Sequence, residues 1–487
     1  MSDDAVSREQ LDSLQNNAKQ AADLIRKTVE NGEFIHVVSH LDADGLAAAG
    51  IIGKALARLG AVFRIRIERW LDEKVASSIA ADKPALTVFA DFGSGNLDVL
   101  NSQLADNRLI ILDHHQFTEE PSPTFVHVNP HLHGIDGSRD LSGAGVAYFM
   151  AKALDKANVD LAPIAVVGAL GDRQDKYASR TLGGANKILV EDAETTGGLQ
   201  TEIDLLFFGR ETRPIHKALA YTTVPFIPDI SGQEDRSVAF LASIGITPKK
   251  GDKWRALRDL SEEEKKKLCS ALADHLASKG LSGNVALNLI GRVYMLAHEE
   301  PWTPLRDARE FSVLLNSTGR IGRASLGVAI CMGDRGVALE EANKVLGEYR
   351  RTITKYLSWL TEEPGRIEEL NSIYVVHGEG IIDDKMIGTI SSILSTNLPK
   401  LEKPLIAYSA VQGEEFAKFS ARTLDPVVKK GLNLGDILKI AGEKYSGRGG
   451  GHNIAAGAQV PIKNVDAFIK LVDELVKKQL EGKPLEG

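Results

Sequence analysis

The feature that most constrains this chain is a short apolar stretch that runs directly into acidic and imidazole side chains. Residues 34–39 are apolar and β-branched enough to form a buried strand, and His40-Leu41-Asp42-Ala43-Asp44-Gly45 follows them. Residues 46–59 are rich in Ala, Leu and Ile, which is typical of a helix. An open α/β sheet binds its ligands where strands lead into helices. One imidazole and two carboxylates at such a place predict a divalent cation site.

Three later apolar runs end in the same kinds of residue. Residues 86–90 precede Asp91, residues 109–112 precede Asp113-His114-His115, and residues 164–171 precede Asp172. A helix cap would explain one aspartate of the first motif, but it leaves His40 and the other clusters unexplained. We therefore expect four strand ends to deliver these side chains to one site.

Two of these motifs together resemble a known signature. Asp113-His114-His115, preceded by His40-x-Asp42-x-Asp44-Gly45, resembles the DHH phosphoesterase superfamily. Gly447-Arg448-Gly449-Gly450-Gly451-His452 is similar to the glycine-rich signature of the domain that accompanies DHH domains. The chain resembles most the RecJ-type nucleases, specifically the archaeal GINS-associated ones. This resemblance implies an α/β fold with a parallel-sheet catalytic domain, an inserted middle domain and a smaller α/β C-terminal domain.

The resemblance also implies a division of labour at a two-metal centre. One ion would be held by His40 and Asp42, the other by Asp44, His114 and Asp172, and Asp91 would bridge them. Mixed nitrogen and oxygen ligands suit Mn²⁺, with Mg²⁺ as the alternative, and the candidates are too many for one ion. Asp113 would orient a histidine, and His115 would face the scissile phosphate as a hydrogen-bond donor.

A second predicted site lies near the C-terminus. Phe419-Ser420-Ala421-Arg422 resembles the Ser-x-Arg element with which this family's C-terminal domain holds substrate. Consecutive glycines let backbone N–H groups approach an anion, although a tight turn is their ordinary meaning. The predicted substrate-binding residues are Ser420, Arg422, Arg448, Gly449, Gly450, Gly451 and His452.

Length and composition set the domain organisation. The 487 residues exceed a single core, and 43% hydrophobic with 25% charged residues is typical of a globular protein. A Pro-containing break at 224–228 predicts a boundary. We predict a catalytic domain over 1–225, an inserted domain over 235–345, a helical linker over 346–370 and a C-terminal domain over 371–487. Two cysteines and an acidic N-terminus without a signal sequence favour the cytoplasm, and no membrane is expected.

Two short motifs keep more than one interpretation. Ser142-Gly143-Ala144-Gly145 precedes an apolar helix and either binds a phosphate or packs closely against the sheet. Residues 314–320, Leu-Leu-Asn-Ser-Thr-Gly-Arg, look like the Asn-x-x-Gly-Arg element of RecJ proteins.

Three functions compete. The first is a nuclease of single-stranded DNA or RNA, for which the resemblance implies 5′ to 3′ action on DNA in replication or repair. The second is a phosphodiesterase of short oligonucleotides or cyclic dinucleotides, and the third is a non-catalytic replication scaffold. The complete ligand set argues against the scaffold, and the extra block at 235–345 argues against a small substrate. That block either docks the GINS complex or completes a nucleic-acid channel. The net charge of −8 restricts nucleic-acid binding to a local basic groove.

Overall fold

The computed structural model describes residues 6–117, 119–222, 227–280, 287–397 and 403–485. It divides into two compact units, residues 1–346 and 347–487. The boundary predicted at residue 225 falls on 223–226, outside the described residues. None of the described helices is long and apolar enough to span a lipid bilayer.

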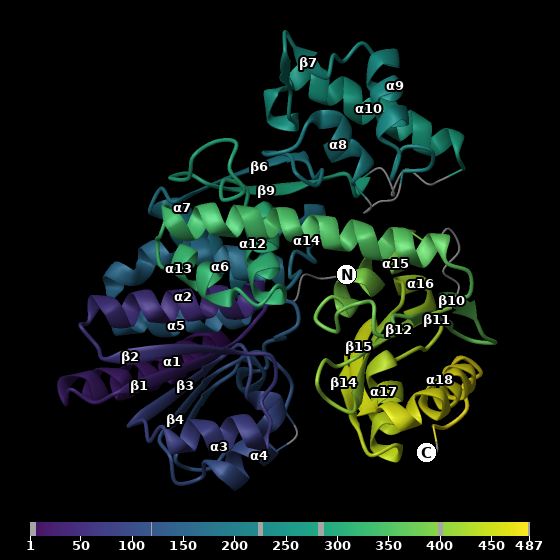
Figure 1. Ribbon diagram of the computed structural model, residues 1–487. Coiled ribbons are helices and arrows are strands. Elements are labelled where there is room, and N and C mark those ends of the chain that lie inside the picture. Colours follow the sequence, from purple (N-terminus) through teal and green to yellow (C-terminus); the bar gives the residue numbers. More distant parts are fainter. Residues whose placement is uncertain (1–5, 118, 223–226, 281–286, 398–402, 486–487) are drawn as a thin grey trace. The chain divides into compact units, whose positions relative to one another are not determined.

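A five-stranded parallel sheet forms the centre of the first unit (Figure 1). Its order is β2-β1-β3-β4-β5, and every neighbouring pair is parallel. The strands are β1 (Ile35–His40), β2 (Phe63–Glu68), β3 (Leu86–Ala90), β4 (Leu109–Leu112) and β5 (Phe125–Val128). Strands β3 and β4 are buried along their whole length, which explains why their sequences are continuous apolar runs. The predicted parallel-sheet domain is confirmed.

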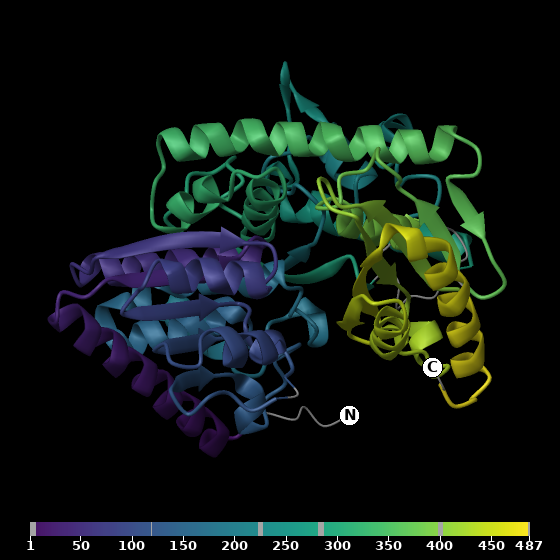
Figure 2. The same cartoon turned by 60° about the horizontal axis from the view of Figure 1, so that its bottom comes forward.

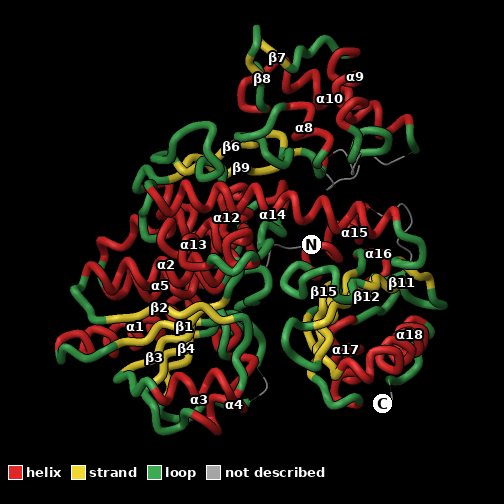
Figure 3. Tube along the Cα trace, in the orientation of Figure 1, coloured by secondary structure: helices red, strands yellow, loops and turns green. Residues whose placement is uncertain are grey.

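Helices cover both faces of this sheet (Figures 1 and 3). On one face, Val37 and Val88 share a core with α1 (Arg8–Glu30), α2 (Ala43–Arg58), α5 (Gly143–Leu154) and α6 (Ala162–Gly171). On the other, Val38 and Phe89 share a core with α3 (Glu73–Ala81) and α4 (Leu97–Gln103). Alternate strand residues point to opposite faces, so consecutive valines enter different cores.

The prediction of a strand over 164–171 is wrong, because these residues belong to helix α6. Residues 162–170 are all buried, so the helix carries no polar face and its sequence has no helical period. A short apolar run of this kind cannot be assigned to strand or helix by periodicity.

A second core lies within the middle of the chain, between Leu205 and Ile290. Its elements are β6 (Leu199–Leu205), α8 (Ile215–Ala220), α9 (Glu234–Ser243), β7 (Lys249–Lys250), β8 (Lys253–Trp254), α10 (Glu262–Ser278) and β9 (Ile290–Leu296). Just before this core, α7 (Asn186–Thr195) is helical, whereas residues 199–205 form a strand. Strand β6 pairs antiparallel with β9, a partner distant in sequence that local periodicity does not reveal.

The end of the predicted inserted domain packs elsewhere. Helices α12 (Ala308–Arg320) and α13 (Ala324–Cys331) contribute to the core around α2 and α6. The hydrophobic cores thus group residues differently from the predicted block 235–345. Helix α14 (Val337–Glu362) then runs as one continuous helix (Figure 2) and, with β10 (Ile367–Glu369), occupies the predicted linker region.

The second unit contains a six-stranded mixed sheet of order β10-β11-β12-β13-β15-β14. Its other strands are β11 (Tyr374–His377), β12 (Leu405–Ala410), β13 (Phe416–Arg422), β14 (Arg448–Gly451) and β15 (Ala455–Pro461). Its helices are α15 (Ile387–Asn397), α16 (Asp425–Val428), α17 (Leu434–Lys444) and α18 (Val465–Leu480). Only β11 and β12 pair in parallel.

Short 3₁₀ helices complete the described structure: Ser94–Asn96, Pro130–His133, Lys156–Leu161, Ala178–Arg180, Leu257–Asp259 and Ile462–Asn464.

Candidate metal centre

The loop that leaves β1 carries the first two predicted ligands. His40 is the last residue of β1, and Asp42 is the N-cap of α2, where its Oδ1 accepts a hydrogen bond from Gly45 N (3.1 Å). The other oxygen of Asp42 lies 3.0 Å from His40 Nδ1. Asp42 therefore caps a helix with one oxygen and faces the imidazole with the other.

Asp44 is buried in the first turn of α2. Its two oxygens accept hydrogen bonds from Gly143 N (2.7 Å) and Ala144 N (3.0 Å) at the N-terminus of α5. The helix start considered as a phosphate site thus holds a carboxylate of the protein itself, which the helix dipole also favours. Burial, with Asp91 nearby, raises the pKa of Asp44 well above its ordinary value.

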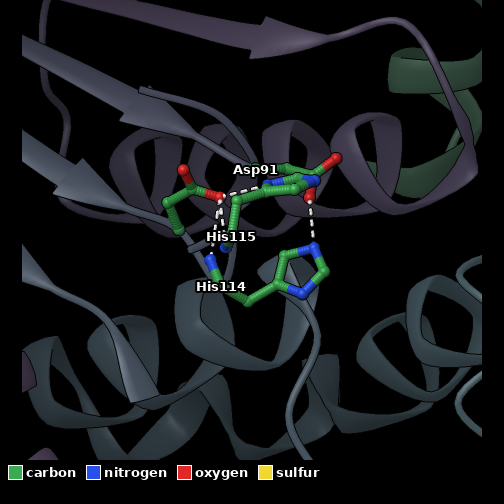
Figure 4. Close-up of side chains that lie close together, drawn as sticks. Asp91, His114 and His115 are labelled. Atoms are coloured by element: carbon green, nitrogen blue, oxygen red, sulfur yellow. Dashed lines mark hydrogen bonds and ion pairs between the residues drawn. The ribbon is translucent and has the colours of Figure 1, made fainter. Parts of the chain in front are cut away.

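Asp91 follows β3 and has a backbone φ of 59°, which a residue other than glycine seldom adopts. Its Oδ1 is buried and makes no hydrogen bond, although His114 Nε2 is 3.2 Å away (Figure 4). A Cβ atom on Gly143 would come within 2.4 Å of that oxygen. Asp91 Oδ1 is therefore a sterically confined oxygen that lacks a hydrogen-bond donor, as suits a metal ligand.

In the Asp113-His114-His115 motif, Asp113 supports its neighbours through hydrogen bonds, and both histidine rings have a fixed orientation. Asp113 is fully buried and accepts hydrogen bonds from Ser94 N and His114 N (both 2.8 Å) and from His115 Nδ1 (2.7 Å). His114 Nδ1 donates to the carbonyl of Gly137 (2.6 Å), because a carbonyl can only accept. This leaves Nε2 of His114 as the ligand atom that faces Asp91.

Asp172 sits at the C-terminal end of α6, with Oδ2 3.8 Å from His114 Nδ1. Gln174 Nε2 donates to this oxygen (2.8 Å), and Gln174 Oε1 in turn accepts from Asn186 Nδ2 (2.6 Å). Sequence reasoning missed both amides, because neither belongs to a recognisable motif. A carboxylate held by such a chain of amides has a defined orientation.

The Asn-x-x-Gly-Arg element supports the loop after β1 from α12. Asn316 Oδ1 accepts a hydrogen bond from Ala43 N (3.2 Å), and a Cβ atom on Gly319 would lie 1.7 Å from the carbonyl oxygen of Leu41. The sequence singled out this element without assigning it a role. In the structure it contacts the backbone on both sides of Asp42.

Ligand-type atoms gather in three sets, each within 4.8 Å: His40, Asp42 and Asp91; Asp44, His114 and Asp172; and Asp91, Asp113, His114 and His115. Burial alone would lower the pKa of His40, but Asp42 and Asp91 beside it raise that pKa to about 10. The cluster of carboxylates is thus compensated by imidazolium charge, which a bound cation would replace. Donor types, burial and geometry all fit a divalent ion.

Two of the predicted substrate residues of the second unit, Ser420 and Arg422, lie on one face of its sheet. Ser420 and Arg422 are two residues apart on β13, and the cross-strand register aligns Ser420 with Gly457 and Gly450. Ser420 contacts Ser391 on α15 (2.9 Å between hydroxyl oxygens), and Arg422 Nε donates to Ser392 Oγ (3.0 Å).

Residues Arg448–Gly451 of the glycine run form an edge strand, β14, and not the tight turn that consecutive glycines ordinarily form. A Cβ atom on Gly449 would meet the Leu438 carbonyl oxygen at 2.0 Å, so this glycine lets α17 pack on the opposite face. At Gly450 the space is open, and Arg448 is exposed. His452 follows the strand, and its N–H donates to the carbonyl of Ala455 (2.8 Å).

Comparison with known proteins gives matches along most of the chain. Residues 34–170 match the N-terminal domain of the DHH family, residues 207–290 the DHH-CID domain, and residues 371–478 the DHHA1 domain. An uncharacterized protein of Methanocaldococcus jannaschii is 33% identical over 477 residues, covering 96% of this chain and 99% of the relative. The chain belongs to the DHH family.

This DHH protein is RecJ-like. The single-stranded-DNA-specific exonuclease RecJ of Thermus thermophilus is 32% identical over 167 residues, which cover 32% of this chain and 24% of RecJ. The crystal structure of that RecJ with Mn²⁺ matches 95% of this chain and 55% of its own, with a TM-score of 0.56 at 20% identity. CDC45 of Entamoeba histolytica shares the fold over 95% of this chain and 99% of its own, with a TM-score of 0.64 at 12% identity.

Proposed function

We propose that this DHH protein is a metal-dependent exonuclease that hydrolyses phosphodiester bonds of single-stranded nucleic acid, acting 5′ to 3′ on DNA. The observation that carries the proposal is the convergence of four carboxylates and two imidazoles around Asp91. The shared fold with CDC45 fits the non-catalytic alternative, whereas the gathering of ligand-type side chains around Asp91 favours catalysis. The related RecJ of Thermus thermophilus is a single-stranded-DNA-specific exonuclease, which supports single strands as the substrate class.

Two Mn²⁺ ions are the proposed cofactor, with Mg²⁺ as the alternative. His40 and Asp42 would hold one ion, and Asp44, His114 and Asp172 the other, with Asp91 between them. When bound, such a pair would supply an activated water and charge stabilisation for the attacking and leaving oxygens of an in-line displacement at phosphorus. The two trios of ligand atoms found here support this division.

His115 is the proposed donor to the phosphate or the leaving oxygen. Its Nδ1 is held by Asp113, and 48% of its side chain is exposed, so Nε2 remains available to a substrate. Burial would lower the pKa of His115, but the Asp113 carboxylate raises it overall. The buried Asp113 carboxylate therefore orients the His115 ring and favours its protonated form, which can donate a hydrogen bond.

Turnover of end-labelled single-stranded DNA and RNA with Mn²⁺ tests the proposal. Asp44→Ala and Asp172→Ala should each abolish nearly all hydrolysis while the far-UV circular dichroism stays native. Asp98→Ala, which removes an exposed carboxylate from α4, is the matched control and should keep the wild-type rate. A wild-type rate in either metal-site variant would disprove the two-metal centre.

Substrate form is tested on the same protein. Single-stranded ends should be cut far faster than blunt duplex ends, and labelling each end in turn reports polarity. Equal rates on both forms would rule out single-strand specificity.

The GINS complex is a further proposed partner, through the middle of the chain. Deletion of 235–345 would remove α12 and α13 from the first core, so the test needs surface substitutions instead. Charge reversals on exposed residues of α9 and α10 should weaken co-purification of GINS. Undiminished co-purification with all such variants would argue that this region serves only nucleic acid.

A further inference from the structure

The hairpin formed by β7 and β8 concentrates positive charge in an acidic protein. Residues 249–259 contain five basic and two acidic side chains, whereas the whole chain carries a net charge of −8. The hairpin borders a cavity of about 470 Å³ lined by Lys250, Lys253, Trp254, Arg255, Asp259 and Trp302. Figure 3 shows β7 and β8 at the far end of the first unit from β1, β3 and β4. This surface, here called the Trp254–Trp302 face, is therefore separate from the candidate metal centre.

Both tryptophans are unusually accessible for their type. Trp254 is 48% exposed and Trp302 is 53% exposed, while large aromatic side chains are ordinarily mostly buried. The ring of Trp254 is supported by buried His216, with 4.5 Å between ring centroids. Trp302 has a φ of 68°, a conformation that costs energy for a bulky residue. Both rings are thus exposed to solvent at a cost in stability, through lost burial of apolar surface and, for Trp302, a strained backbone.

The cations around these rings fall into two groups. Arg255 is paired with Glu264 (2.5 Å) and Arg258 with Glu211 (2.5 Å), so both guanidinium groups are committed within the fold. Arg258 also lies over the Trp302 ring, 4.9 Å from its centroid. In the described parts of the chain, Lys250 and Lys253 have no carboxylate within ion-pair distance, and both are exposed. The two arginines therefore hold this part of the chain together through ion pairs, and the two lysines are available to bind a ligand.

The two acidic side chains of this segment, Asp252 and Asp259, leave its net charge positive. Asp259 Oδ2 accepts a hydrogen bond from Ala256 N (2.7 Å), which uses it to cap a short helical turn. Lys249 Nζ lies 4.3 Å from the centroid of the Trp254 ring and adds a third exposed cation. Exposed cations next to exposed aromatic rings would suit a partner that carries both anionic groups and flat apolar groups.

We propose that the Trp254–Trp302 face binds single-stranded nucleic acid, with bases stacked on the two tryptophans and phosphates on Lys250 and Lys253. Exposed aromatic rings next to unpaired cations are how proteins bind single strands without sequence preference, because every base presents a π face. An acidic peptide would satisfy the lysines but would not require two exposed rings. This inference rests on the proposed function and deepens it, since it assigns a second grip on the substrate remote from the candidate metal centre.

Equilibrium binding in EDTA tests the face without hydrolysis. Fluorescence anisotropy of the full-length protein with labelled oligothymidylate of about 30 and about 6 nucleotides compares strands with different reach. We expect Trp254→Ala/Trp302→Ala and Lys250→Glu/Lys253→Glu each to weaken binding of the long strand at least tenfold. Lys266→Glu/Lys267→Glu, which reverses two exposed lysines on α10 of the same region, is the matched control and should change affinity less than twofold.

Several outcomes separate this inference from the proposed function. Thermal unfolding of each variant confirms that the fold is intact, and quenching of tryptophan fluorescence by the strand, lost in the double tryptophan variant, reports stacking directly. Wild-type affinity in both folded variants would overturn the inference, as would tryptophan-dependent binding of polyglutamate in place of the strand. If the strand binds through this face but Mn²⁺ yields no hydrolysis, the proposed function fails while the inference stands.

Discussion

Gly319→Ala is a one-atom test of how α12 positions the candidate metal centre. A Cβ atom there would lie 1.7 Å from the carbonyl oxygen of Leu41, whereas ordinary contact begins at 3.4 Å. The two backbones must therefore separate by roughly 1.7 Å, the difference between these distances. Leu41 lies between His40 and Asp42, and metal ligands tolerate displacements of only about 0.2 Å. We expect Mn²⁺ affinity to fall at least about 10- to 100-fold, as it does when ligand support is lost.

The free energy of unfolding should change in a way that depends on position. Overpacking costs about 1–3 kcal/mol, and the higher helix propensity of alanine offsets about 1 kcal/mol of it. Gly347→Ala is the matched control: it lies inside α14, where the nearest atom to a new Cβ is Arg351 Nη1 at 3.6 Å. That variant should gain up to about 1 kcal/mol and keep its Mn²⁺ affinity.

Calorimetric titration of the metal-free protein with Mn²⁺, together with urea denaturation, measures both quantities. Gly319→Ala with wild-type affinity and stability would refute the close approach of α12 to the loop. A stability loss without any loss of affinity would show that the contact supports packing alone and that the loop holds its ligands unaided.

Three further predictions concern other parts of the molecule. Gln174→Leu removes the donor to Asp172 Oδ2 and should weaken Mn²⁺ binding about 10- to 100-fold in the same titration, and an unchanged affinity would exclude a positioning role for Gln174. Arg448→Ala should lose a charged hydrogen bond to substrate of about 1.5–3 kcal/mol, or roughly ten- to a hundredfold in kcat/KM, whereas a raised Mn²⁺ requirement with unaltered KM would contradict a substrate role. Burial, with Arg64 nearby, lowers the pKa of His36 to about 4, so the folded state binds fewer protons than the unfolded state between pH 6.5 and 4 and stability falls as pH is lowered through that window. His36→Gln should flatten this fall in urea denaturation series, and an unchanged slope would assign it to other groups.

Most residues of the candidate metal centre could be singled out from the sequence because they follow recognisable local patterns. Asp91 and the Asp113-His114-His115 motif each follow a continuous apolar strand, and such strands in a parallel sheet end at a common edge. Asp172 was expected at the end of a strand but follows α6, since a helix buried on all sides mimics a buried strand, and its Oδ2 lies 3.8 Å from His114 Nδ1. The backbone amides that bind Asp44 could not be distinguished from a phosphate site, because that distinction depends on which anion the fold brings there.

Contacts between distant segments were the part that the sequence did not reveal. Nothing local to Gln174 indicates that its amide meets Asp172, and the pairing of β6 with β9 depends on tertiary context. The glycine run shows the same limit. Glycines permit a phosphate loop and a close-packed strand equally well, and it is the Leu438 carbonyl behind Gly449 that decides for the strand.

The carboxylates around Asp91 repel one another, and this repulsion explains the hydrogen bonds that support them. Four carboxylates, Asp42, Asp44, Asp91 and Asp172, share one small volume with two imidazoles, and burial next to like charge raises the pKa of Asp44. The fold reduces the repulsion with fixed dipoles: a backbone N–H on Asp42, two on Asp44 and an amide on Asp172. Asp91 Oδ1 is buried without a hydrogen bond and lies 3.2 Å from His114 Nε2, so positive charge is needed between the trio that contains Asp91 and the trio that contains His114. A divalent cation is the group that meets this demand with the shortest contacts, and the same supports that hold the carboxylates together then fix its coordination geometry.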